Sequence, residues 1–450
     1  MKMRELVLAT AVAALGATLA QTDATGPKDE LTWHDAGAFL CGRGFAHTTH
    51  PYGRLDPADT NRLTAGVRWR GLDSAGLCLR FRTDSRRLAI RWRLMKTYEG
   101  GNMNRFGNDG MDVYRRTADG WHFVGAKGGM PGKTNELVVA WRPNDEALVY
   151  LPLYNGAVDV RVGTLSGART EACGEQGKPV VFYGTSITQG GCASRPGMAY
   201  TAILQRRLNV PVVNMGFSGS GCMEDEMAET LAKIDAAAYV IDTMWNIGIN
   251  TVSKGRYESF VRRLRKLRPD VPILLMNDYH FAYHGRQTEK GAAAEKLFAR
   301  LHAEPAFAKG FALVDGSGLY DREGNGTVDG THPDSVGMMR LADAIGPRLA
   351  ALLQLVDGSF APGHWCRGDG ALAVVNVREG RTRPLAALRV RFAQATRRLR
   401  RGRICCVRHE CTTGGTRSRA SVAPTPFSVE RELDPPVAGR NTWRHIPRTK

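Results

Sequence analysis

The spacing of the apolar residues changes once along the chain, near residue 170, and this change limits the fold more than any other feature. Before it, apolar and polar residues alternate, as where Leu77, Leu79 and Phe81 are separated by Arg80 and Arg82. A period of two predicts half-buried antiparallel strands. After it, short apolar runs alternate with stretches of helical spacing, which predicts buried parallel strands joined by helices.

The first part, residues 30–165, is predicted to be a β-sandwich, jelly-roll-like in character. Clusters of Gly, Asn, Asp and Pro separate seven or eight strand-like runs in this part of the chain. Such a series of short strands with turn signals between them is typical of sandwiches and jelly rolls. The runs are at residues 77–81, 90–94, 111–114, 122–124, 137–141, 148–153 and 158–162.

The second part, residues 178–354, is predicted to be a three-layer α/β/α domain around a five-stranded parallel sheet. Its buried strands are expected at residues 180–183, 212–214, 238–242, 273–276 and 311–314. Helical spacing is found at residues 199–208, 257–267, 290–302 and 336–352. A joint rich in Gly, Thr and Glu near residues 164–178 separates the two parts.

The formal charge of +18 is concentrated at one end of the 450-residue chain. Residues 361–450 hold 19 of the 62 Lys and Arg but 6 of the 44 Asp and Glu, a charge of +13, which leaves +5 for the rest. The body of the protein therefore lacks the composition of a nucleic-acid-binding protein. The Arg-rich tail at 358–450 is predicted to be disordered. A polyanion or cell-surface anchor and a non-native reading-frame extension are the alternatives.

The first twenty residues have the layout of a secretory signal peptide. Lys2 and Arg4 precede an apolar run from Leu6 to Leu15, and the small residues Thr18 and Ala20 follow. The alternative, a buried N-terminal helix, is less consistent with the short run and the polar stretch after it. No later run is long enough to span a membrane, so we expect an exported protein, periplasmic or extracellular, with no integral membrane segment after maturation.

Cysteine and histidine spacing gives no metal or disulfide framework. The nine cysteines are an odd and scattered set, and no paired C-x-x-C pattern is present. His280 and His284 are four residues apart, but no carboxylate motif accompanies them. We interpret them as ordinary polar histidines and expect neither a metal nor another cofactor.

Two segments contain the residue types of nucleophilic catalysis. Ser186 directly follows a predicted buried strand, at the sheet edge where α/β folds place their sites. Asp329 and His332 lie three residues apart just before the last helix. A serine becomes nucleophilic when an imidazole takes its proton and a carboxylate orients that imidazole. Taken singly, Ser186 as a helix cap and Asp329 as a turn residue are equally good interpretations.

Two further loops follow the second and third strands of the predicted parallel sheet. They contain Gly219 and Asn246, whose backbone and side-chain N–H groups are suitable donors to the oxyanion of acyl transfer. A tight glycine turn and a helix-capping asparagine are the structural alternatives.

The order Ser, Gly, Asn and His on successive loops resembles the SGNH, or GDSL-like, hydrolase superfamily over residues 178–354. Gly184-Thr185-Ser186 resembles the first block, with Thr185 where Asp is usual. The segments 110–114 (Gly-Met-Asp-Val-Tyr) and 190–200 resemble a bacterial two-domain subgroup, in which a β-sandwich with a G-x-D-L-Y-type motif precedes the esterase domain.

This resemblance implies a role for each matched residue. Ser186 would be the nucleophile, His332 the general base and acid, and Asp329 its orienting carboxylate. The oxyanion hole would consist of the Ser186 and Gly219 backbone amides and the Asn246 side-chain amide. Three residues are candidate substrate contacts: Arg195, Trp245 and Asp112. The structural alternatives for these three are an ion pair, a core position and an interdomain contact, respectively.

The expected function is a secreted serine esterase that removes short acyl groups, acetyl above all, from a carbohydrate. Its partner would be an acylated small molecule or polysaccharide, with no nucleic acid. A lipase or lysophospholipase, and a catalytically silent carbohydrate-binding protein, are the alternatives. Cys192 and Cys222 follow the first two of these loops, so a disulfide at the rim of the site is a further hypothesis.

Overall fold

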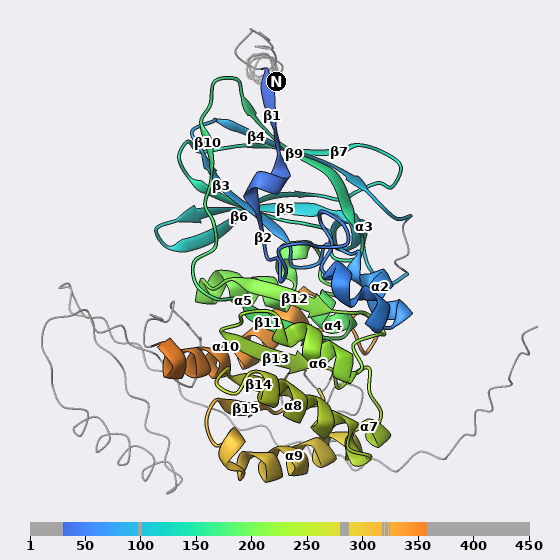
Figure 1. Cartoon of the computed structure of the whole chain (residues 1–450). Coiled ribbons are helices and arrows are strands. Elements are labelled where there is room, and N and C mark those ends of the chain that lie inside the picture. Colours follow the sequence, from blue (N-terminus) through green and yellow to red (C-terminus); the bar gives the residue numbers. More distant parts are fainter. Residues whose placement is uncertain are drawn as a thin grey trace, which may run out of the picture. The chain divides into compact units, whose positions relative to one another are not determined.

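The computed structural model describes residues 30–357 except 98–100, 280–287, 317–318, 320–322 and 324. Figure 1 shows a β-rich part, β1 to β10, followed by an alternating α/β part, β11 to α10. The predicted signal peptide, the Arg-rich tail and the pair His280 and His284 lie outside the described residues. Within the described ranges, no helix is long and apolar enough to cross a membrane.

The β-rich part consists of two antiparallel sheets, as the period-two pattern predicts. The first sheet has the order β1 (Leu31–Asp35), β9 (Ala157–Leu165), β4 (Arg87–Leu94), β7 (Asn135–Ala140). The second has the order β10 (Thr170–Ala172), β3 (Cys78–Thr83), β8 (Glu146–Tyr150), β5 (Met111–Thr117), β6 (Gly120–Lys127), with β2 (Leu40–Cys41) paired to β3. Four short helices lie in the connections between the strands of the β-rich part: η2 (Ala36–Phe39), η3 (Pro57–Arg62), α2 (Ala65–Gly71) and α3 (Arg105–Asp109).

The two sheets enclose one apolar core. Phe81 from β3, Ile90 and Trp92 from β4, Val113 from β5 and Val149 from β8 are all fully buried in it. The alternating arginines point away, since Arg82 and Arg93 are exposed. Alternation along β3 and β4 therefore directs their apolar side chains into the core between the two sheets.

The α/β part has a five-stranded, fully parallel sheet. Its order is β12 (Val212–Gly216), β11 (Val180–Gly184), β13 (Ala238–Asp242), β14 (Ile273–Met276), β15 (Phe311–Val314). The five strands coincide with the five predicted runs to within two residues. Because β11 lies between β12 and β13, the loops that leave these three strands meet at one edge of the sheet.

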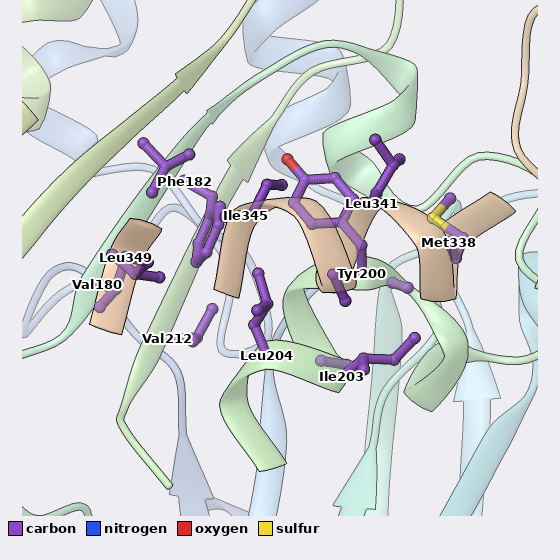
Figure 2. Close-up of a cluster of buried hydrophobic side chains, with 14 of the residues drawn as sticks. Val180, Phe182, Tyr200, Ile203, Leu204, Val212, Met338, Leu341, Ile345 and Leu349 are labelled. Atoms are coloured by element: carbon purple, nitrogen blue, oxygen red, sulfur yellow. The ribbon is translucent and has the colours of Figure 1, made fainter. Parts of the chain in front are cut away.

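Helices cover both faces of this sheet. Figure 2 shows one face, where Val180, Phe182 and Val212 of β11 and β12 meet side chains of α5 (Tyr200–Leu208) and α10 (Ser335–Asp357). On the other face, Val181 and Tyr183 pack in one cluster with α6 (Asp225–Ala232), α8 (Arg256–Leu267) and α9 (Glu289–His302). The predicted fold class, α/β/α after a β-sandwich, is confirmed.

The short elements complete the α/β part. They are α4 (Ser186–Gln189), η4 (Pro196–Met198), α7 (Ile249–Ser253) and η5 (Pro305–Phe307). The two parts share apolar packing, because Tyr114 and Tyr150 of the sandwich belong to the same cluster as Tyr200 of α5. The hydroxyl of Tyr150 also donates to the Ala202 carbonyl of α5 at 3.2 Å.

Candidate active site

The turn after β11 presents Ser186 as the first residue of α4. Thr185 caps this helix: its hydroxyl accepts from the Ile187 N–H at 3.2 Å, and its own N–H donates to the Thr188 hydroxyl at 3.3 Å. Thr and Asp are both preferred N-cap residues. The departure of Thr185 from the usual GDSL pattern therefore leaves the turn intact.

The loop before α10 forms a turn around the Asp329 carboxylate. Oδ1 of Asp329 accepts from the backbone N–H groups of Thr331 (3.1 Å) and His332 (2.8 Å). Gly330 has the left-handed φ of 80° that this turn requires. The turn places the other carboxylate oxygen beside the imidazole of His332.

Ser186, His332 and Asp329 form a continuous chain of hydrogen bonds. Nδ1 of His332 lies 2.8 Å from Oδ2 of Asp329, and Nε2 lies 2.9 Å from Oγ of Ser186. A carboxylate only accepts, so in the neutral imidazole Nδ1 carries the proton and Nε2 accepts from the serine hydroxyl. This is the arrangement of a serine hydrolase before reaction.

The Asp329 carboxyl is held in its ionised form. Partial burial alone raises its pKa, but the His332 N–H, the Asn102 amide and the His332 ring donate to it and together hold the pKa well below its ordinary value. The carboxylate is therefore ionised near neutral pH and available to orient the imidazole.

Packing of α10 on α5 brings the Asp329 loop back to Ser186, although β15 is at the far edge of the sheet. At the start of α10, the Ser335 hydroxyl donates to Ser194 Oγ at 2.7 Å. Ser194 follows the Ser186 turn closely in sequence. The helix start is thus fixed to the segment that carries the serine.

Gly219 and Asn246 lie close together beside the turn that carries Ser186. Gly219 has a φ of 67°, and a Cβ there would find no atom within 4 Å, so the residue is required for its backbone conformation and borders open space. The side chain of Asn246 lies against the same loop: with its oxygen turned toward the loop it accepts from Ser220 N (3.2 Å) and Gly221 N (3.1 Å). The structure therefore brings the second and third predicted blocks together.

The buried carboxylate of Asp242 holds α4 through a hydrogen bond from Thr188. Asp242, at the end of β13, is inaccessible to solvent and accepts from the hydroxyls of Thr188 (2.9 Å), Tyr200 (2.9 Å) and Tyr279. Burial raises the pKa of this carboxyl, and the three donors oppose the shift. The network joins the Ser186 turn to α5 and to the segment after β14.

A pocket of about 170 Å³ opens next to His332, and both parts of the chain line it. Gly191, Cys192, Ser218 and His332 come from the α/β part. The remaining lining residues come from the sandwich part: Arg70, Asn102, Met103, Asn108 and Tyr154. The sequence analysis did not identify these five residues. They lie in connections between strands, and the local sequence of a connection does not indicate whether it approaches Ser186 in the folded protein.

Two of these sandwich residues contact the Ser186–His332–Asp329 chain directly. The Tyr154 hydroxyl donates to the Ser186 carbonyl at 3.0 Å. The Asn102 amide donates to Oδ2 of Asp329 at 2.8 Å. A third link is Gln189 of α4, whose amide donates to the buried Asp73 carboxylate at 2.9 Å and to the Leu153 carbonyl at 3.0 Å.

The three candidate substrate contacts lie elsewhere. Asp112 of β5 is fully buried, accepts from Gly197 N at 3.0 and 3.1 Å, and pairs with Arg195 at 3.1 Å. This matches the alternatives of an interdomain contact and an ion pair. Trp245 is half-buried against the core, with Nζ of Lys290 5.6 Å from its ring centre. Neither Asp112, Arg195 nor Trp245 lines the pocket.

The disulfide hypothesis is wrong, since Cys192 and Cys222 are both free thiols. Each instead lies near a different backbone carbonyl, Asn102 O (3.5 Å) and Asn246 O (3.8 Å). The two sulfurs therefore have different hydrogen-bond partners.

Cys192, Asp329 and His332 are the one group of three or more His, Cys, Asp or Glu residues in the described part of the chain whose possible metal-ligand atoms all lie within 4.8 Å of one another. Burial, with a smaller effect of Asp329, raises the pKa of the Cys192 thiol to about 12, which disfavours the thiolate that a metal would bind. Asp329 and His332 are moreover hydrogen-bonded to each other, which occupies two possible metal-ligand atoms, Oδ2 and Nδ1. The absence of a metal stays a prediction.

Family models match both parts of the chain. The model of the GDSL-like lipase/acylhydrolase family matches residues 177–350, and the GxDLY model, the N-terminus of SGNH-hydro-type esterases, matches residues 31–170. A candidate GDSL-like lipase from Bacteroides ovatus is 30% identical, with a TM-score of 0.66, and the match covers 72% of this chain and 98% of that one. The chain belongs to the GDSL-like lipase/acylhydrolase family.

As a GDSL-like hydrolase, the protein is an esterase or acylhydrolase, which confirms the resemblance seen in the sequence. A salicylyl-acyltransferase from a tetracycline biosynthetic pathway shares the two-part fold, at 19% identity and a TM-score of 0.57, over 72% of this chain and 97% of that one. No curated protein matches the chain.

Proposed function

We propose that this GDSL-like hydrolase is an exported serine esterase that removes short acyl groups, acetyl above all, from a polar alcohol such as a carbohydrate. The proposal is supported chiefly by the unbroken hydrogen-bond chain from Ser186 through His332 to Asp329. The arrangement of Lys2, Arg4 and the apolar run after them supports export.

In the proposed reaction, Oγ of Ser186 attacks the ester carbonyl carbon while its proton passes to Nε2 of His332. The carbonyl oxygen becomes an oxyanion, which accepts from the N–H groups of Ser186, Gly219 and Asn246. When this intermediate collapses, the C–O bond to the alcohol breaks and His332 returns the proton to the leaving oxygen. A water then attacks the acyl-enzyme in the same way and releases the acid and free Ser186.

The size of the pocket favours a short acyl group. An apolar cavity of about 150 Å³ accommodates benzene, so the 170 Å³ available here suits a group of similarly few atoms. The lining favours a polar alcohol, because Arg70, Asn102, Asn108 and Ser218 contribute hydrogen-bonding groups. A lipase would instead need an extended apolar channel for its acyl chain.

The test is hydrolysis of p-nitrophenyl acetate, butyrate and octanoate by the mature protein and by its Ser186→Ala variant. We expect the highest kcat/KM with acetate and loss of all turnover above background in the variant. A preference for octanoate would favour a lipase. Folded protein without Ser186-dependent turnover, on these esters and on acetylated polysaccharides, would instead favour a carbohydrate-binding protein.

A further inference from the structure

Asn102 reaches from the sandwich part to the acid–base pair of the α/β part. It lies on the connection between β4 and α3, and its Nδ2 donates to Oδ2 of Asp329 at 2.8 Å. The same nitrogen is 3.3 Å from Nδ1 of His332. Asn102 therefore contacts both partners of the bond that orients the imidazole.

The backbone is held at Asn102 and on its C-terminal side. Asn104 caps α3, since its Oδ1 accepts from Gly107 N at 2.9 Å, and Met103 between them is buried. At Asn102 itself, the Cys192 thiol donates to the backbone carbonyl at 3.5 Å. The amide is thus presented to Asp329 from a fixed segment, although its own side chain is exposed.

Among the described residues, Asn102 is the one hydrogen-bond partner of the Asp329 carboxylate that lies outside the Asp329–His332 loop. Oδ1 accepts from the backbone of this loop, and Oδ2 accepts from the His332 ring and from Asn102. The Asp329 side chain is 35% exposed. Without Asn102, Oδ2 has room to turn toward water and to take the imidazole with it.

We propose that Asn102 is a positioning residue of the esterase: it fixes Asp329, and through it His332, so that Nε2 faces Ser186. The sandwich part then completes the active site, since Tyr154 also holds the Ser186 carbonyl at the other end of the chain of hydrogen bonds. The inference rests on the proposed esterase function.

This role predicts a defect in rate with little defect in binding. Misplacement of a reacting group by about 1 Å costs about 10²-fold in rate. The imidazole acts in the chemical steps, so Asn102→Ala should lower kcat for p-nitrophenyl acetate by about 10- to 10²-fold and leave KM within about threefold. Asn61→Ala is the matched control, because Asn61 is exposed on η3; it should keep wild-type kcat.

A second variant changes the charge at the same place. The charged and titratable groups that face His332 are Asp329 on its own loop, Cys192 after α4, and Arg70 and Tyr154 from the sandwich part across the pocket. Asn102→Asp adds a carboxylate beside them, which favours the imidazolium. Since the general base must be neutral, the acidic limb of the kcat/KM profile should move to higher pH by about one unit. An unmoved limb would mean that the side chain at position 102 does not lie beside the imidazole.

A third measurement separates this inference from the esterase proposal. A fluorophosphonate labels a serine that a neighbouring base activates, whatever the natural ester. The wild-type protein should label at Ser186 at least tenfold faster than Asn102→Ala, with equal melting temperatures. If the wild type labels in this way but hydrolyses no ester, the esterase proposal fails and the positioning role stands. Equal labelling rates and equal pH profiles in the wild type, Asn102→Ala and Asn102→Asp would overturn the inference.

Discussion

Asp112 and Arg195 form an ion pair between the sandwich and the α/β part, with Oδ2 of Asp112 3.1 Å from Nε of Arg195. The carboxylate also accepts from Gly197 N, and the Tyr114 hydroxyl accepts from Arg195 at 3.2 Å. Asp112 and Tyr114 belong to the Gly110–Tyr114 motif that the sequence singles out. The motif thus binds the segment that follows the Ser186 turn through an ion pair and hydrogen bonds to Arg195 and Gly197. These contacts stabilise the site from outside the pocket.

Asp112→Ala should therefore lower stability more than it lowers activity. Removal of this carboxylate leaves the Gly197 N–H without its acceptor and Arg195, which is 23% exposed, without its carboxylate, so we expect a cost of about 1–3 kcal/mol. Urea unfolding measures this loss. The matched control is Asp235→Ala, which removes an exposed pair with Lys178 and should cost less than about 1 kcal/mol. A large fall in kcat/KM at unchanged stability would instead assign Asp112 to substrate binding.

Gly216→Ala should disturb the turn that carries Ser186. A Cβ at Gly216 would lie 2.2 Å from the backbone nitrogen of Gln189, so α4 would have to move. We expect a lower melting temperature together with a kcat reduced by at least tenfold. Gly174→Ala is the control, because a Cβ there meets no atom within 4 Å. Wild-type kcat in a folded Gly216→Ala protein would mean that α4 does not need its observed position.

The acid limb of the pH–rate profile should report one group. Hydrogen bonds hold the pKa of Asp329 below its ordinary value near 3.9, so this carboxylate stays ionised above about pH 4 and does not contribute to the limb. A plot of log kcat/KM against pH should therefore rise with a slope of one and then level off. A slope of two would show that a second group must also lose a proton.

Met103→Ala should widen the acyl preference. Met103 is 6% exposed and lines the pocket, so its truncation enlarges the space beside His332. The ratio of kcat/KM for butyrate over acetate should rise several-fold, at a cost of about 2–5 kcal/mol in stability. The exposed Met130 provides the control: Met130→Ala should leave the ratio unchanged. An unchanged ratio in Met103→Ala would place the acyl group elsewhere.

The sequence predicted those parts of the structure that local patterns determine. Period-two alternation located β3 and β4, and strand-like runs between turn signals located β5 to β9. Five short apolar runs located β11 to β15, because burial on both faces of a strand produces such runs directly. The order of Ser186, Gly219, Asn246 and His332 was informative for a related reason. Parallel strands deliver their following loops to one edge of the sheet.

The sandwich side of the pocket could not be predicted in this way. Asn102 and Tyr154 lie in irregular connections, and their contacts with Asp329 and Ser186 span 227 and 32 residues. No local pattern encodes such a contact, since it depends on how the two parts pack. The same limit applies to Arg195: the family resemblance made it a candidate substrate contact with an ion pair as the alternative, and its partner Asp112 comes from the other part of the chain.

The central claim is that Ser186 is the nucleophile and that His332 activates it. The most direct test is peptide mass spectrometry after treatment with a fluorophosphonate, on the wild-type protein and on His332→Ala. The account predicts a single adduct, on Ser186, that forms at least 10²-fold more slowly in the variant. An adduct on another residue, or equal labelling of Ser186 in both proteins, would contradict it.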